Sequence, residues 1–287
     1  MPKILFKPDK EITKLNALIF QTSFEKKNIK KYILLKPPLA IKNQIKSIEA
    51  LCDKVGWYYL ISALLGTDKI GKQNKKKLLN TLEEYEKEFE RYYKKIYEKE
   101  KKYCDKIQKK SKGRLLKLFR QADKYTKIKT DRKVFIIPVL FFYGGMSFHK
   151  GKNIFVLLPV IDRFRNDEDT FYLILHESLH PIGNLIKEKS MLAKKLEKKI
   201  SLKKFKKLEI EEYGSVVNII NESFTRSIDY RLAVLNGRSE VEYIKNCKKF
   251  ALTLEFYNAL KNDYEKQKFI YKNIRNFGFK WIKKNLL

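Results

Sequence analysis

Residues 170–183 read TFYLILHESLHPIG, and this stretch predicts the helix around which the chain is organised. His176 and His180 are four residues apart, so on an α-helix they lie one above the other on the same side. The opposite side is mainly apolar, which indicates that the helix packs on a core and presents its histidines at the front. Pro181 and Gly183 should end the helix within a turn. The opposite side comprises Phe171, Ile174, Leu175, Ser178 and Leu179.

The spacing H-E-x-x-H has a chemical reason. Two imidazoles one helical turn apart can reach the same metal ion. Glu177 is offset by about 100° and lies beside that ion, where a carboxylate can take a proton from bound water and pass it to a leaving amine. The chain has 3 His and 22 Glu in 287 residues. At this composition the pattern would arise by chance about 0.002 times.

A zinc site of this kind needs a third protein ligand and one open position. Cys52, Cys104 and Cys247 stand far apart and form no C-x-x-C pair, so cysteine ligands are excluded. His149, the remaining histidine, falls in an expected hairpin turn, where an exposed position is favoured. The third ligand is therefore expected to be a carboxylate.

The distribution of lysine indicates where that carboxylate lies. The segments 153–186 and 208–244 contain no lysine, although simple proportion predicts about 13 in their 71 residues. The second segment predicts a helix from about 208 to 235, with Glu222 on its polar face. A solvated face in so lysine-rich a chain should carry lysines, so this face is expected to point at a metal. Glu222 is the favoured third ligand, with Glu211 and Asp229 as rivals.

The chain carries 64 basic and 33 acidic residues, a net charge of +31, and Lys outnumbers Arg 54 to 10. Such an excess suggests a polyanionic partner such as nucleic acid or an anionic membrane surface, bound weakly through the Lys-rich helices of 72–133. The alternative is a chain-wide preference for lysine. The scarcity of Arg, whose guanidinium binds phosphate in a bidentate manner, favours this alternative.

The periodicity changes along the chain. Residues 48–66 predict a helix or a helix pair that ends at Gly66, and residues 74–121 predict a further helix. A stripe of apolar residues along 78–97 predicts a long helix packed on its own domain, with a coiled-coil arm or a partner-binding helix as the alternative. Residues 133–145 are β-rich, and a hairpin is expected around Gly151. Residues 240–287 predict two more helices, so 133–162 is the only clear β region. The class is α+β.

Several classes are excluded. No apolar run reaches the length of a membrane span, and the charged first twenty residues do not resemble a secretory signal. Three widely separated cysteines fit a reducing compartment, so we expect a cytoplasmic protein. The sequence does not define an oligomeric state.

The HESLH helix followed by NESFTR resembles the gluzincin branch of zinc metallopeptidases, whose uncharacterised bacterial and archaeal families it is most similar to. The Asn-Glu pair is similar to the N-E-x-x-S-D motif of thermolysin-like enzymes, with Thr225 and Arg226 in place of Ser and Asp. The resemblance spans about residues 133–236. It implies zinc ligands His176, His180 and Glu222, with Glu177 as the catalytic base. It also implies that FFYGGMSF or NIFVLLP is an edge strand that pairs with a peptide.

The remaining site residues are open at this point. Arg226 could orient Glu222 or bind a substrate carbonyl or carboxylate, and Arg226, Tyr230 and Tyr143 are candidates for stabilising an oxyanion. We therefore expect a zincin-like core at 133–239, with a small sheet, a His-bearing helix and a Glu-bearing helix. A Lys-rich helical region at 1–132 precedes it and a helical region at 240–287 follows. The expected function is peptide-bond hydrolysis with one Zn²⁺ per chain, acting on a peptide or protein substrate. The alternative is a polyanion-binding protein with a structural or vestigial metal site.

Overall fold

The structure is a computed structural model, and it describes residues 3–22, 40, 42–67, 70–129, 132–140, 145–160, 167–205, 209–210, 213–250, 252–267 and 270–287. The chain forms two compact units. Unit 1 comprises Met1–Arg114 and Asp131–Ile174, and unit 2 comprises Leu115–Thr130 and Leu175–Leu287. The class is α+β, as predicted. The unit boundaries cut across the three regions expected from the sequence, because the long helices α4 (Lys72–Thr126) and α5 (Asp167–Gly183) each continue from one unit into the other.

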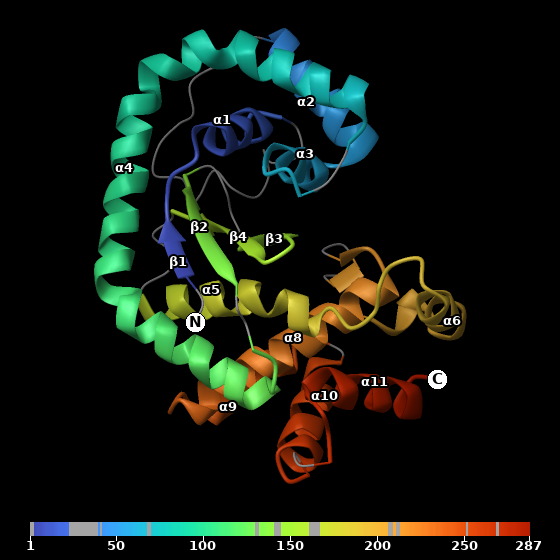
Figure 1. Cartoon of the computed structure of the whole chain (residues 1–287). Helices are drawn as coiled ribbons and strands as arrows, with labels where there is room; N and C mark the ends of the chain where they lie inside the picture. The colour runs from blue at the N-terminus through green and yellow to red at the C-terminus, as the bar shows by residue number, and fades with distance from the viewer. Residues whose placement is uncertain are drawn as a thin grey trace. The chain divides into compact units, whose positions relative to one another are not determined.

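Unit 1 contains a four-stranded sheet in the order β1-β2-β4-β3, visible in Figure 1. β1 (Lys3–Phe6) and β4 (Asn153–Pro159) both run parallel to β2 (Lys133–Val139). β3 (Met146–Lys150) is antiparallel to β4, and the turn between them contains Gly151 at φ 55°, which confirms the predicted hairpin. Pro138 lies two residues beyond the last β1 partner, Ile136, where its missing N–H is tolerated.

Helices supply the rest of the unit 1 core. They are α1 (Lys10–Ile19), α2 (Lys42–Val55), α3 (Trp57–Leu64) and the first part of α4. The apolar stripe of α4 is buried in this core through Leu78, Leu82, Tyr85, Phe89 and Ile96. Most of the stripe therefore packs on its own domain, as predicted, while Tyr92 and Tyr97 are exposed.

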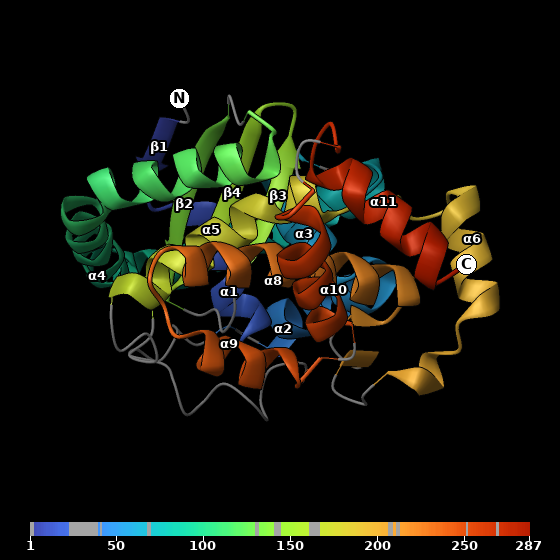
Figure 2. The same cartoon turned by 90° about the horizontal axis from the view of Figure 1, so that it is seen from below.

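Unit 2 is built around α8 (Val216–Leu235), which begins at an N-cap where Ser215 accepts a hydrogen bond from the Asn218 N–H at 3.1 Å. Around it pack α6 (Met191–Lys199), α9 (Glu240–Cys247) and α10 (Thr253–Ala259), and α10 lies beside α8 in Figures 1 and 2. A 3₁₀ turn (Leu202–Lys204), a π-helical turn (Leu260–Tyr264) and α11 (Ile274–Asn285) complete the unit. Arg231 of α8 is buried and donates to both carboxylate oxygens of Glu265 at 2.7 Å. This bidentate pair fixes α8 against the segment after the π-helical turn.

Several predictions were wrong in detail. β1 lies in the region expected to be helical, and its four residues pair with β2 more than a hundred positions later. α8 begins at Val216 instead of about 208, because Gly214 at φ 69° breaks the backbone just before the cap.

Further differences concern the strands and the C-terminal region. The C-terminal region has three described α-helices instead of two. NIFVLLP is the internal strand β4, so it is not an edge; within the described sheet the edge next to it is β3, which contains Met146–Phe148. His149 lies in β3, partly buried, and not in the turn. Within the described residues no helix combines the length and the apolar character needed to cross a membrane.

Candidate metal centre

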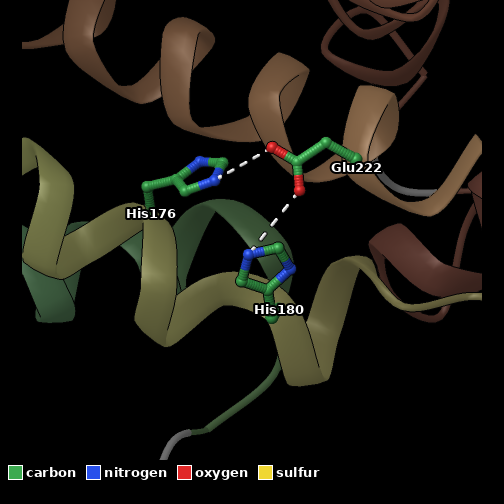
Figure 3. A group of neighbouring side chains, drawn as sticks. All are labelled: His176, His180 and Glu222. Carbon is green, nitrogen blue, oxygen red and sulfur yellow. Dashed lines mark ion pairs between the residues drawn. The ribbon is translucent and has the colours of Figure 1, made fainter. Parts of the chain in front are cut away.

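Two helices of unit 2 bring three metal-ligating side chains together. His176 and His180 project from α5, and Glu222 projects from α8 between them (Figure 3). The ligand atoms of the three residues lie within 4.8 Å of one another. The three ligands predicted from the sequence therefore lie close together in space, although 42 positions separate His180 from Glu222.

The spacing of the ligand atoms suits a zinc ion. His176 Nε2 lies 3.3 Å from Glu222 Oε1, and His180 Nε2 lies 3.7 Å from Glu222 Oε2. Ligand atoms about 2.0–2.1 Å from a tetrahedral metal ion are roughly 3.3 Å apart. All three side chains are largely buried, with exposed fractions of 12% for His176, 19% for His180 and 11% for Glu222. Two imidazoles and a carboxylate form the donor set typical of catalytic zinc, so these residues fit the ion.

A close contact sets the spacing between α5 and α8. A Cβ atom on Gly183 would lie 1.9 Å from Thr225 Oγ1 and 2.9 Å from Thr225 Cα, so only glycine allows this approach. Gly183 follows His180 by three residues, and Thr225 follows Glu222 by three. The contact between the small residues therefore lies next to the ligands and determines how closely the helices can bring them together.

A hydrogen-bonded clamp holds the chain just after α5 against α8. The side chain of Asn221 accepts from the backbone N–H of Ile186 at 3.0 Å and donates to its carbonyl at 2.9 Å. Arg275 of α11 donates to the carbonyls of Pro181 and Ile182 at 2.8 and 3.0 Å. These carbonyls belong to the last turn of α5, where the helix itself provides no backbone N–H group to donate to them. Side chains from two other helices thus complete the end of the His-bearing helix.

Charged groups surround the three ligands. Glu177 is 5% exposed, and its Oε2 lies 3.5 Å from His180 Nε2, so this carboxylate is next to the candidate metal position. Asp229, one rival for third ligand, faces the other side of the first imidazole: its Oδ2 is 3.8 Å from His176 Nδ1. The geometry therefore favours Glu222 as the ligand and places Asp229 where a carboxylate can orient a ligating histidine.

Arg226, one turn after Glu222, supplies the opposite charge. Its Nε lies 2.7 Å from Glu222 Oε1, and its Nη2 donates to the Tyr213 hydroxyl at 2.6 Å. The guanidinium carbon stacks 4.2 Å from the centroid of the Phe250 ring. Tyr230 lies one turn further along α8, with its ring 4.8 Å from that of Tyr243.

These charges shift the pKa values of the site. Burial alone would lower the pKa of His176, but the Glu222 carboxylate outweighs burial and raises this pKa to about 8. Burial would raise the pKa of Glu222, yet Arg226 and His176 hold it far below its ordinary value. Burial raises the pKa of Asp229 to about 7. Glu222 is therefore an anion at any ordinary pH, and it is available to a cation.

Two residues considered from the sequence, Tyr143 and Glu211, lie outside the described residues. Gly183, Asn221 and Tyr213 were not anticipated. The role of Gly183 could have been predicted from the sequence. Gly183 follows His180 by three residues, and Thr225 follows Glu222 by three, so two small residues stand at the same distance from two ligands. The Asn221 clamp has no such signal, because it depends on where the chain after α5 passes.

Comparison of the chain with family models, curated proteins and solved structures gives no match.

Proposed function

We propose that this protein is a zinc-dependent hydrolase that cleaves peptide bonds in a peptide or protein substrate. One observation supports the proposal above the others: the ligand atoms of His176, His180 and Glu222 lie within 4.8 Å of one another, with the Glu177 carboxylate beside them. This donor set would hold one Zn²⁺ per chain. The ion would supply a Lewis acid that polarises a carbonyl and lowers the pKa of water.

Glu177 performs the proton transfers in this proposal. Its buried carboxylate accepts a proton from the attacking water and donates it to the departing amide nitrogen. His176 and His180 provide ligands through Nε2. Asp229 faces His176 Nδ1 and keeps that ring oriented. Tyr230 and Tyr143 remain candidates for stabilising the oxyanion. The buried free thiols of all three cysteines support our expectation of a reducing, cytoplasmic location.

The test separates metal binding from catalysis. Protein purified without chelator is analysed for metal and incubated with unstructured protein substrates, and cleavage products are read by mass spectrometry. Glu177→Gln should retain zinc and lose at least about a hundredfold in cleavage rate. Glu188→Gln is the matched control, because Glu188 is exposed in the segment after α5. Wild-type protein with less than a tenth of an equivalent of zinc, or a Glu177→Gln variant that cleaves at the wild-type rate, would contradict the proposal.

A second function is favoured by the charge on α4. Between residues 91 and 110, eight exposed side chains are basic and two are acidic, Glu98 and Asp105. Such a surface suits the phosphate backbone of nucleic acid. A labelled DNA duplex should then bind with a steep salt dependence that weakens when four lysines of this face become Gln, but not when four lysines of α6 do. Equal weakening by both sets, or no binding at moderate salt, would dismiss this function. The first set is Lys94, Lys101, Lys102 and Lys109, and the second is Lys194, Lys195, Lys198 and Lys199.

A further inference from the structure

Arg226 occupies a position that allows little freedom to its guanidinium. Three segments hold it: Glu222 one turn earlier on α8, Tyr213 before α8, and Phe250 after α9. Its side chain is 21% exposed. The ion pair with Glu222 and the hydrogen bond to Tyr213 use two edges of the planar fork, while Phe250 covers a face. The guanidinium is therefore confined between Glu222, Tyr213 and Phe250, and its charge is paired with the Glu222 carboxylate.

We infer that Arg226 is a positioning residue that fixes the orientation of the Glu222 carboxylate towards His176 and His180. This inference rests on the proposed zinc site. Arg226 Nε lies 2.7 Å from Oε1, which is itself 3.3 Å from His176 Nε2, and Oε2 lies 3.7 Å from His180 Nε2. The guanidinium thus fixes the direction in which the carboxylate faces the two histidines. A carboxylate held in one orientation offers a metal ion a constant set of oxygen atoms, and so it sets how many coordination positions remain for water and substrate.

This role requires the planar, forked shape of the Arg226 guanidinium as well as its positive charge. Only a planar guanidinium can contact Glu222 through Nε while Nη2 donates to Tyr213, and the lysine ammonium is a single point of charge. Neutralisation of a buried carboxylate would need only the charge. Arg226→Lys therefore distinguishes positioning from neutralisation, and Tyr213→Phe tests the anchor of the fork by removing one hydroxyl.

The experiment uses Co²⁺ in the full-length protein, because its visible absorption is intense at low coordination number and weakens as further ligand atoms bind. Spectra and zinc affinities, the latter by competition with a chromophoric chelator, are measured for wild type, Arg226→Gln, Arg226→Lys and Tyr213→Phe. Lys198→Gln removes one exposed positive charge of the same unit and serves as the control. Circular dichroism of each metal-loaded variant reports whether its fold is retained.

The expected result is an intense Co²⁺ spectrum for wild type and Lys198→Gln. Arg226→Gln and Arg226→Lys should both show weaker absorption and a 10- to 100-fold change in zinc affinity. Tyr213→Phe should change the Co²⁺ absorption and the zinc affinity in the same direction but to a smaller extent. If the Arg226 variants fail to fold, the result for Tyr213→Phe tests the inference. A wild-type spectrum in the folded variants would overturn the inference and leave the zinc site intact. Failure of the wild type to bind Co²⁺ or zinc would overturn the inference together with the proposed function.

Discussion

Replacing Gly183 with alanine should force α5 and α8 apart at the point where their ligands meet. The added Cβ would lie 1.9 Å from Thr225 Oγ1, 2.8 Å from Thr225 Cβ and 2.9 Å from Thr225 Cα. The hydroxyl could turn away, although it would lose its 2.9 Å hydrogen bond to the Asn221 carbonyl. The Cα cannot turn away. Because carbon atoms normally approach to about 3.5–4.0 Å, the helices must separate locally by about 0.6–1 Å.

This displacement sets the magnitude of the effect. Overpacking in a core costs about 1–3 kcal/mol, and a clash with backbone belongs at the upper end, so we expect about 2–3 kcal/mol. For a chain of this size that lowers the unfolding midpoint by roughly 5–10 °C. His180 and Glu222 precede the clash by three residues each and move with their helices. Zinc affinity should therefore fall at least about tenfold.

Thermal unfolding followed by circular dichroism and zinc competition with a chromophoric chelator measure the two effects. The control is Gly113→Ala: Gly113 lies within α4, and nothing lies within 4 Å of its added Cβ. It should raise stability by about 0.5–1 kcal/mol, since alanine favours the helix. Adding Thr225→Gly to Gly183→Ala should restore part of the zinc affinity. A Gly183→Ala variant with wild-type stability and zinc affinity would refute the idea that this contact sets the helix spacing.

Two further predictions concern buried polar groups. Burial raises the pKa of Glu100 from 4.5 to about 8, so the folded state retains a proton that the unfolded state loses, and stability should fall as the pH rises between these values. Glu100→Gln can still pair with the Thr13 hydroxyl, which lies 3.0 Å away. The variant should lose less stability than the wild type between pH 5 and pH 8.5, as measured by urea unfolding. An unchanged loss would assign the pH dependence of stability to other groups. Asn221→Ala unpairs the backbone of Ile186 and should cost about 1–3 kcal/mol, whereas the exposed Asn184→Ala should cost little; equal costs would exclude the clamp.

The sequence was most informative where chemistry constrains residue types. The spacing of His176 and His180 predicted a helix that the structure has, ending at Gly183 as expected. The absence of lysine from the face of α8 predicted burial, and Glu222 and Asp229 are buried. Both signals are local: one is set by helical periodicity, the other by the cost of burying an ammonium group.

The features that the sequence did not reveal are tertiary. β1 is four residues long and owes its strand conformation to β2, more than a hundred positions away. The helical pattern across 48–66 left a single helix and a helix pair both open, and the backbone of Gly56 at φ 85° makes the break between α2 and α3. Arg226 was assigned several roles from its position alone. Only the contacts with Tyr213 and Phe250, which come from segments flanking α8 and α9, favour one of them.

The central claim is that His176, His180 and Glu222 bind one zinc ion. A crystal structure of protein purified without chelator, with diffraction recorded on both sides of the zinc absorption edge, tests it most directly. We predict one anomalous peak per chain, with the Nε2 atoms of both histidines and one oxygen of Glu222 about 2.0–2.2 Å from it. A peak held by Asp229 instead of Glu222, or the absence of a peak from this site after zinc has been added, would contradict the claim.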